Sequence, residues 1–142
     1  MKPTSTLSAS EMVSAARKGI DNLSPTKAYE ELIRGEATLI DVREPHEYER
    51  EKIAGAINAP RGMLEFYADP ATPYYRSEFA SDTRLIICCA SGGRSALAAQ
   101  TLSNMGYMRT AHVDGGISAW KAANLPTVDF ARFENSVQEQ NN

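Results

Sequence analysis

Two short apolar runs with helical patterns around them constrain the fold of this chain most strongly. They read ATLIDV at residues 37–42 and RLIICC at residues 84–89. Short apolar runs of this kind are typical of buried strands. Because amphipathic helical patterns alternate with them, the sequence predicts βαβ units and an α/β fold, with a mainly parallel central sheet flanked by helices.

Start and stop signals place the other elements. The SASE segment at residues 8–11 has the spacing of a capping box and starts a helix that ends near Gly19. Ser24, followed by proline, starts a second helix that Gly35 stops. Further helices are expected over PHEYERE, SALAAQTLSNMG and ISAWKAANLP, and further strands over GAINAP and TAHVDGG.

The length of 142 residues is that of one ordinary domain. We expect an N-terminal helical extension over residues 1–23, the domain itself over residues 24–128, and a polar, disordered C-terminal tail over residues 129–142. The segment at 61–84 is rich in aromatic residues. It would either line a pocket and select an acceptor, or pack as a satellite hydrophobic cluster.

Composition narrows the class of partner. Fifteen Lys and Arg against 18 Asp and Glu give a net charge of −3, so no basic face for nucleic acid is expected. No apolar run approaches the roughly 20 residues of a membrane span, and the first residues lack the apolar core of a secretory signal. We therefore expect a soluble, cytoplasmic protein with no membrane partner.

The two cysteines are adjacent, at positions 88 and 89. A vicinal pair cannot adopt ordinary disulfide geometry without distorting the peptide between them. His46 and His112 lie far away in sequence with no ligand spacing, so neither a metal site nor a cofactor is expected, and we assign both histidines structural roles. One cysteine is interpreted as a small buried hydrophobe, and the other as reactive.

The loop CASGGRS after the second run, residues 89–95, has the features of an anion cradle. If Cys89 ends a strand and Ser95 starts a helix, the small residues between them let successive backbone amides turn toward one point. The helix N-terminus adds positive potential. A thiol at that point would be acidified, and a charged adduct such as a persulfide anion would be stabilised. The alternative is an ordinary strand-to-helix turn.

This loop resembles the Cys-x-x-Gly-x-Arg-Ser loop of the rhodanese-like sulfurtransferases. Three further segments are similar to family segments and follow the family's order: LIDVREPHEYEREKIAGAINAP, AAQTLSNMGY and VDGGISAW. The resemblance runs from about Ser24 to Pro126. It implies a catalytic cysteine, Cys89, that takes sulfur from a small donor such as thiosulfate or a persulfide and passes it to a thiol, a protein or cyanide.

By the same resemblance, the sulfur is held by the loop after Cys89. The substrate-binding residues are therefore expected to be Ala90, Ser91, Gly92, Gly93, Arg94 and Ser95. Asp41 and Arg43 are expected to support this loop: Asp41 in a buried ion pair with Arg94, and Arg43 in a local pair with Glu47. The Ser91 hydroxyl is a candidate donor to the persulfide. No charge lies between Cys89 and Arg94, whereas members that handle thiosulfate best often carry an extra cation there.

Two other interpretations remain. Counted from Cys88, the sequence Cys-x5-Arg satisfies the pattern of a cysteine-dependent phosphatase or arsenate reductase, whose longer loop wraps an oxyanion. Counted from Cys89, the loop is one residue too short for that role. Alternation along a strand would point Cys88 away from the loop, which favours a packing role for it. The remaining alternative is a non-catalytic interaction or sensing module.

Overall fold

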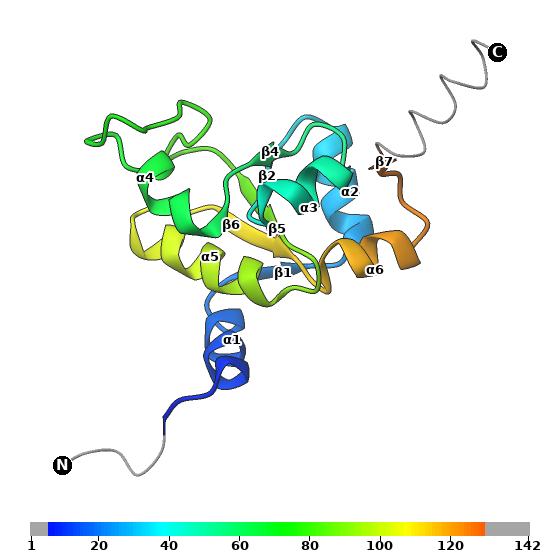
Figure 1. Ribbon diagram of the computed structural model, residues 1–142, viewed down its shortest axis with the longest axis horizontal. Helices are drawn as coiled ribbons and strands as arrows, with labels where there is room; N and C mark the ends of the chain where they lie inside the picture. The colour runs from blue at the N-terminus through cyan, green and yellow to red at the C-terminus, as the bar shows by residue number, and fades with distance from the viewer. Residues whose placement is uncertain (1–5, 130–142) are drawn as a thin grey trace.

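The computed structural model describes residues 6–129 as a parallel sheet with helices on both faces (Figure 1). The helices are α1 (Ala9–Arg17), α2 (Pro25–Ile33), α3 (Pro45–Arg50), α4 (Leu64–Ala68), α5 (Gly93–Asn104) and α6 (Gly116–Ala122), with a 3-10 turn, η1 (Arg61–Met63). The strands are β1 (Asp21–Leu23), β2 (Thr38–Asp41), β3 (Glu51–Lys52), β4 (Ile57–Asn58), β5 (Leu85–Cys88), β6 (Thr110–Val113) and β7 (Val128–Asp129).

The main sheet has five strands in the order β1-β6-β5-β2-β4, and each neighbouring pair is parallel. The predicted α/β class with a mainly parallel sheet is confirmed. β5 lies in the centre, and its last residue, Cys88, is in register with Asp41 of β2. The carboxyl ends of β2 and β5 therefore meet at one edge, where ligands gather in folds of this type.

The two faces of the sheet carry separate parts of the core. Ile86 of β5 packs with apolar residues of α2 and α6, around the fully buried Trp120. Leu85 and Ile87 point to the other face, where they pack with α4 and α5. This alternation follows from the period of two along a strand. For the same reason the last residue of β5 and the first residue of the following loop lie on opposite faces of the sheet.

The first two elements of the chain, α1 and β1, pack onto this body. α1 packs against α5, and Ala16 is completely buried there. β1 precedes Ser24, where we expected the domain to begin, yet it pairs with β6 in the main sheet. Its three residues form the edge strand of that sheet.

The expected C-terminal tail falls almost entirely outside the described residues. Asp129 alone is described, and it pairs with Glu51 in a small antiparallel sheet of β7 and β3. Among residues 6–129, no helix combines the length and the apolar character that a membrane crossing requires.

Candidate active site

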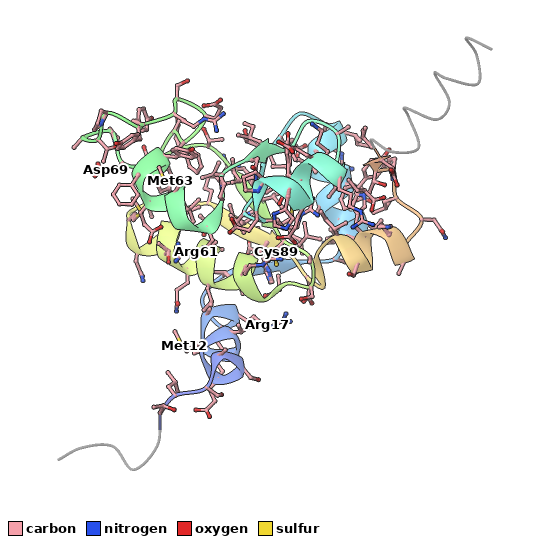
Figure 2. The ribbon with its side chains drawn as sticks, in the orientation of Figure 1. Met12, Arg17, Arg61, Met63, Asp69 and Cys89 are labelled. Carbon is pink, nitrogen blue, oxygen red and sulfur yellow. The ribbon has the colours of Figure 1, made fainter. Side chains whose placement is uncertain are left out.

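The two cysteines face opposite sides of the sheet. Cys88 is fully buried in the α2/α6 side of the core, where burial and then the nearby Asp41 raise the pKa of its thiol well above the usual value. Cys89 lies on the other side, where the sheet meets the first turn of α5 (Figure 2). The packing role expected for Cys88 follows from this geometry, and Cys89 is the thiol at the loop.

Backbone amides converge on the sulfur of Cys89. The N–H of Gly92 donates to Sγ at 3.1 Å, and the N–H of Ser95 donates at 3.3 Å. Both amides belong to the start of α5, a helix of 12 residues. Unpaired N–H groups and the positive end of the helix dipole act together at such a terminus. The arrangement is therefore suited to a sulfur that carries negative charge.

A neighbouring helix holds the loop in this orientation. The first amides of α6 bind the loop carbonyls: Ile117 N–H donates to the Cys89 carbonyl at 2.9 Å, and Ser118 N–H to the Ala90 carbonyl at 3.0 Å. These two hydrogen bonds fix the carbonyls of Cys89 and Ala90 against α6. Gly116 permits this contact, because a Cβ there would lie 2.5 Å from the carbonyl carbon and oxygen of Ala90.

The four charged residues expected to form ion pairs do form them, but each with a different partner than predicted. Asp41 binds Arg43, with Nε and Nη2 of Arg43 at 2.9–3.2 Å from the two carboxylate oxygens. Arg94 instead binds Glu47 through both terminal nitrogens, at 2.8 and 3.1 Å. Local geometry explains the difference: the Arg43 N–H also donates to Asp41, which turns the chain back on itself and places the guanidinium beside the carboxylate.

These two pairs have different roles. Asp41 and Arg43 are buried, and Arg43 also donates to the Glu51 carbonyl at 2.7 Å, so this pair closes the end of β2 against β3. The Arg94–Glu47 pair is partly exposed and joins α5 to α3. The hydrogen bond from Arg94 lowers the pKa of Glu47 from 4.5 to about 2.

Side-chain contacts to the sulfur come from Ser95 rather than Ser91. Ser91 is exposed, whereas Ser95 is buried and its Oγ lies 3.4 Å from Sγ of Cys89. The same Oγ lies 2.9 Å from Nδ1 of His112, and Nε2 of His112 lies 2.8 Å from Oδ1 of Asn22. Neither His112 nor Asn22 was expected near the thiol, because their separation in sequence carries no motif. Only strand order places them there.

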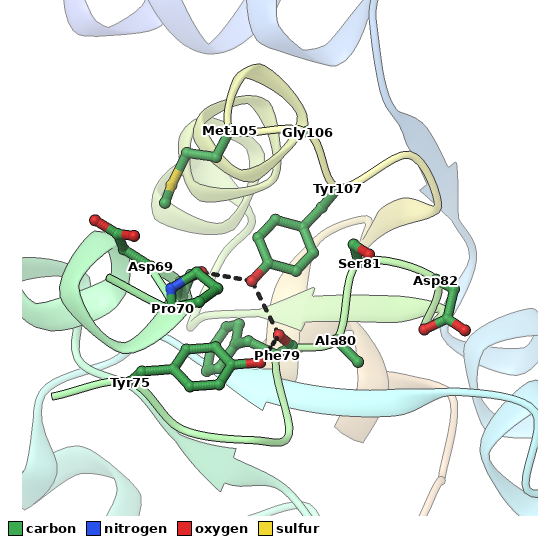
Figure 3. A pocket seen from close by; sticks show the side chains of 11 residues that line it. Asp69, Pro70, Tyr75, Phe79, Ala80, Ser81, Asp82, Met105, Gly106 and Tyr107 are labelled. Carbon is green, nitrogen blue, oxygen red and sulfur yellow. Dashed lines mark hydrogen bonds between the residues drawn. The ribbon is translucent and has the colours of Figure 1, made fainter. Parts of the chain in front are cut away.

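The aromatic segment at 61–84 lines a cavity that no residue of the Cys89 loop reaches. Phe79 and, on the α5 side, Tyr107 pack edge to face in the core, and the Tyr107 hydroxyl donates to the carbonyls of Ala68 and Phe79. The segment lines a cavity of about 580 Å³ together with Met105, which follows the last turn of α5 (Figure 3). α5 has 12 residues and is therefore about 18 Å long at 1.5 Å per residue. Cys89 faces the first turn of this helix, at the opposite end from Met105. Phe79 belongs to the same core cluster as Cys89, so the segment is part of the main core rather than a satellite cluster, and no residue of the Cys89 loop lines the cavity.

Comparisons with known proteins agree with this geometry. The family model described as "Rhodanese-like domain" matches residues 24–123. Thiosulfate sulfurtransferase 16, chloroplastic, of Arabidopsis thaliana is 36% identical over 110 residues, which are 75% of this chain and 91% of that protein.

Solved structures show the same fold. A protein of unknown function from Rhodopseudomonas palustris, described as a possible tyrosine phosphatase, has a TM-score of 0.81 and 38% identity, covering 89% of this chain and 98% of that one. The polysulfide-sulfur transferase homodimer of Wolinella succinogenes has a TM-score of 0.67 and 30% identity, covering 83% and 85%. With the family model matched over most of the described residues, the chain belongs to the rhodanese-like family.

Proposed function

We propose that the protein is a sulfurtransferase that carries sulfur as a persulfide on Cys89. The observation that supports this most directly is the pair of amides, from Gly92 and Ser95, that converge on Sγ at the N-terminus of α5. Donors at a helix N-terminus stabilise a negatively charged group, so such a site would hold a persulfide anion. The sulfurtransferases among the relatives of this chain support the same reaction class.

The reaction would run in two steps. The Cys89 thiolate attacks the outer sulfur of a donor, so that a bond forms between Sγ and that sulfur while the bond within the donor breaks. Thiosulfate would release sulfite, and a persulfide would release a thiol. An acceptor thiolate or cyanide then attacks the outer sulfur of the Cys89 persulfide and regenerates the Cys89 thiolate.

The charges around the loop favour a singly charged organic persulfide over thiosulfate as the donor. Arg94 is the only charged residue from Ala90 to Ser95, and its guanidinium is occupied by Glu47. In the loop, the charge of a bound donor would therefore be compensated by backbone amides alone. A singly charged donor needs less of this compensation than a doubly charged one.

Intact mass spectrometry tests the proposal. Wild type, Cys88→Ser and Cys89→Ser are incubated with thiosulfate or with a small organic persulfide, then measured with and without reductant. We expect wild type and Cys88→Ser to gain sulfur that the reductant removes, and Cys89→Ser to gain none. Equal gain in Cys89→Ser would contradict the role of Cys89.

A phosphatase is the second candidate, because the Rhodopseudomonas structure carries that description. The geometry speaks against it: Cys88, which has the phosphatase spacing to Arg94, faces the other side of the sheet. If no variant gains sulfur while wild type hydrolyses a phosphate ester or reduces arsenate, this candidate replaces the first. If neither reaction occurs, the non-catalytic module remains. A cytoplasmic location stays a prediction.

A further inference from the structure

A buried chain of side chains connects the Cys89 thiol to a histidine. Sγ of Cys89 lies 3.4 Å from Oγ of Ser95, and that oxygen lies 2.9 Å from Nδ1 of His112. Cys89, Ser95 and His112 are each at most 1% exposed. A proton moving along this chain would therefore be shielded from exchange with bulk water.

The partners of Asn22 determine which nitrogen of His112 carries the proton. The Asn22 amide nitrogen donates to the carbonyls of Arg17 and Ile20, at 2.8 and 3.2 Å. Its oxygen is therefore the atom that faces His112, and it can only accept. Nε2 of His112 must therefore be the protonated nitrogen, which donates a hydrogen bond to Oδ1 of Asn22. In a neutral imidazole this leaves Nδ1 as an acceptor facing Ser95.

Burial, more than any nearby charge, keeps His112 neutral at rest. Burial lowers the pKa of His112, and Arg17 of α1 acts in the same direction, while Asp114, which follows β6, opposes them. Asp114 is itself engaged by Arg17 in a two-pronged ion pair. The Cys89 thiol, on the side of α5, is the remaining titratable group at the end of the chain of hydrogen bonds. Nδ1 is thus unprotonated and available near neutral pH.

We propose that His112, acting through the Ser95 hydroxyl, accepts the proton of the Cys89 thiol and so generates the attacking thiolate. This inference rests on the nucleophilic role proposed for Cys89. His112 touches neither the sulfur nor a substrate, so it is a positioning residue for the reaction, and Ser95 is the group in contact with the reacting atom.

The proton shift conserves the hydrogen bonds. In the resting form the thiol S–H donates to Oγ of Ser95, and the Ser95 hydroxyl donates to Nδ1 of His112. Two protons then move one position each: the thiol proton to Oγ, and the hydroxyl proton to Nδ1. The products are a thiolate that accepts from the Ser95 hydroxyl and an imidazolium that donates to Oγ.

The thiolate formed in this way has three donors: the Ser95 hydroxyl and the amides of Gly92 and Ser95. The Gly92 carbonyl, 3.2 Å from Oγ, competes for the hydroxyl proton in the resting form. When the acceptor removes the outer sulfur, the thiolate is regenerated, and the reverse shift returns the proton from His112 to Cys89.

The test is a pH titration of the Cys89 thiolate by its ultraviolet absorbance, with Cys89→Ser as the baseline. His112→Asn keeps a hydrogen-bond acceptor but cannot take a proton. We expect the apparent pKa of Cys89 to rise in this variant, and a rise of one pH unit would leave about tenfold less thiolate near neutral pH. The rate of persulfide formation should fall by the same factor near neutral pH and recover at high pH. Coincident titration curves for wild type and His112→Asn would overturn the inference.

Two further variants complete the test. Ser95→Ala should raise the apparent pKa of Cys89 as well, and Ser95→Ala with His112→Asn should raise it no further than the larger single effect. If His112→Asn does not fold, Ser95→Ala decides, and an unchanged curve there overturns the inference. His46→Asn is the matched control, because His46 is exposed on α3 and is the only other histidine. The titration uses no sulfur donor, so it distinguishes failure of this inference from failure of the sulfur-transfer proposal.

Discussion

At the scale of single residues, the loop around Cys89 depends on Gly116. Its φ of +65° lies in the left-handed region, and a Cβ would lie 2.5 Å from the Ala90 carbonyl. Gly116→Ala should therefore combine backbone strain with a backbone clash and lower the free energy of unfolding by about 3 kcal/mol. Denaturant unfolding measures this loss. Gly55→Ala is the matched control, since Gly55 has φ +83° with nothing within 4 Å, and it should lose only about 1 kcal/mol.

Persulfide loading separates the two glycine variants further. Gly116→Ala should also load less sulfur at temperatures where it remains folded, because the Cys89 and Ala90 carbonyls can no longer bind α6 as they do in the wild type. Gly55→Ala should load sulfur as wild type does. Similar losses of stability in both variants would mean that the strain at Gly116, and not its contact with the loop, sets the effect.

The role of a residue could be predicted only where the local backbone conformation determines the direction of its side chain. Strand alternation predicts from the sequence that Cys88 and Cys89 face opposite sides, and the structure has them so. The partners of Asp41 and Arg94 were not predictable, since each has two opposite charges within reach and side-chain geometry decides between them. The contact of His112 with Ser95 depends on β6 lying next to β5, which no local pattern encodes.

At the scale of elements, Arg94 and Glu47 fasten α5 to α3. The pKa of Glu47 is lowered to about 2 in the folded protein, so folding favours its ionised form. Its contribution is complete above about pH 4.5 and disappears as the pH falls toward 2. Glu47→Gln should cost about 1 kcal/mol at pH 7, because solvent reaches both side chains, and nothing near pH 2.

Denaturant unfolding of wild type and Glu47→Gln across this pH range measures that difference. Glu49→Gln, an exposed glutamate on the same helix, should cost little at any pH in the range. A Glu47→Gln deficit that persists unchanged at the acid end would show that the variant loses packing rather than a charge interaction.

The elements that could be predicted from the sequence are those whose own residues carry a periodic pattern of apolar side chains. β2, β5 and β6, and the longer helices, appear where their patterns predict them. β1, β3 and β7 were not predicted. They have two or three residues each, without a fully buried side chain, and they exist because a partner strand or segment supplies the hydrogen bonds.

At the scale of the whole molecule, α1 and β1, which precede Ser24, belong to the same body as the site. The family model begins at residue 24, yet β1 completes the sheet and supplies Asn22 to His112. Arg17 of α1 binds Asp114, the residue that follows β6. The Rhodopseudomonas structure covers 89% of the chain, which is more than the residues 24–123 that the family model matches.

If α1 is part of that body, a charge on its buried face should destabilise the whole molecule. Ala16 is completely buried against α5, so Ala16→Asp places an unpaired carboxylate in the core and should cost about 3 kcal/mol in a single unfolding transition. Ala15→Asp makes the same change on the exposed face of the helix and should cost less than about 1 kcal/mol. Circular dichroism and tryptophan fluorescence should report the same midpoint, because Trp120 lies on the far side of the sheet from α5. If Ala16→Asp instead melts α1 alone and leaves the fluorescence midpoint unchanged, the helix is an appendage and not part of the cooperative fold.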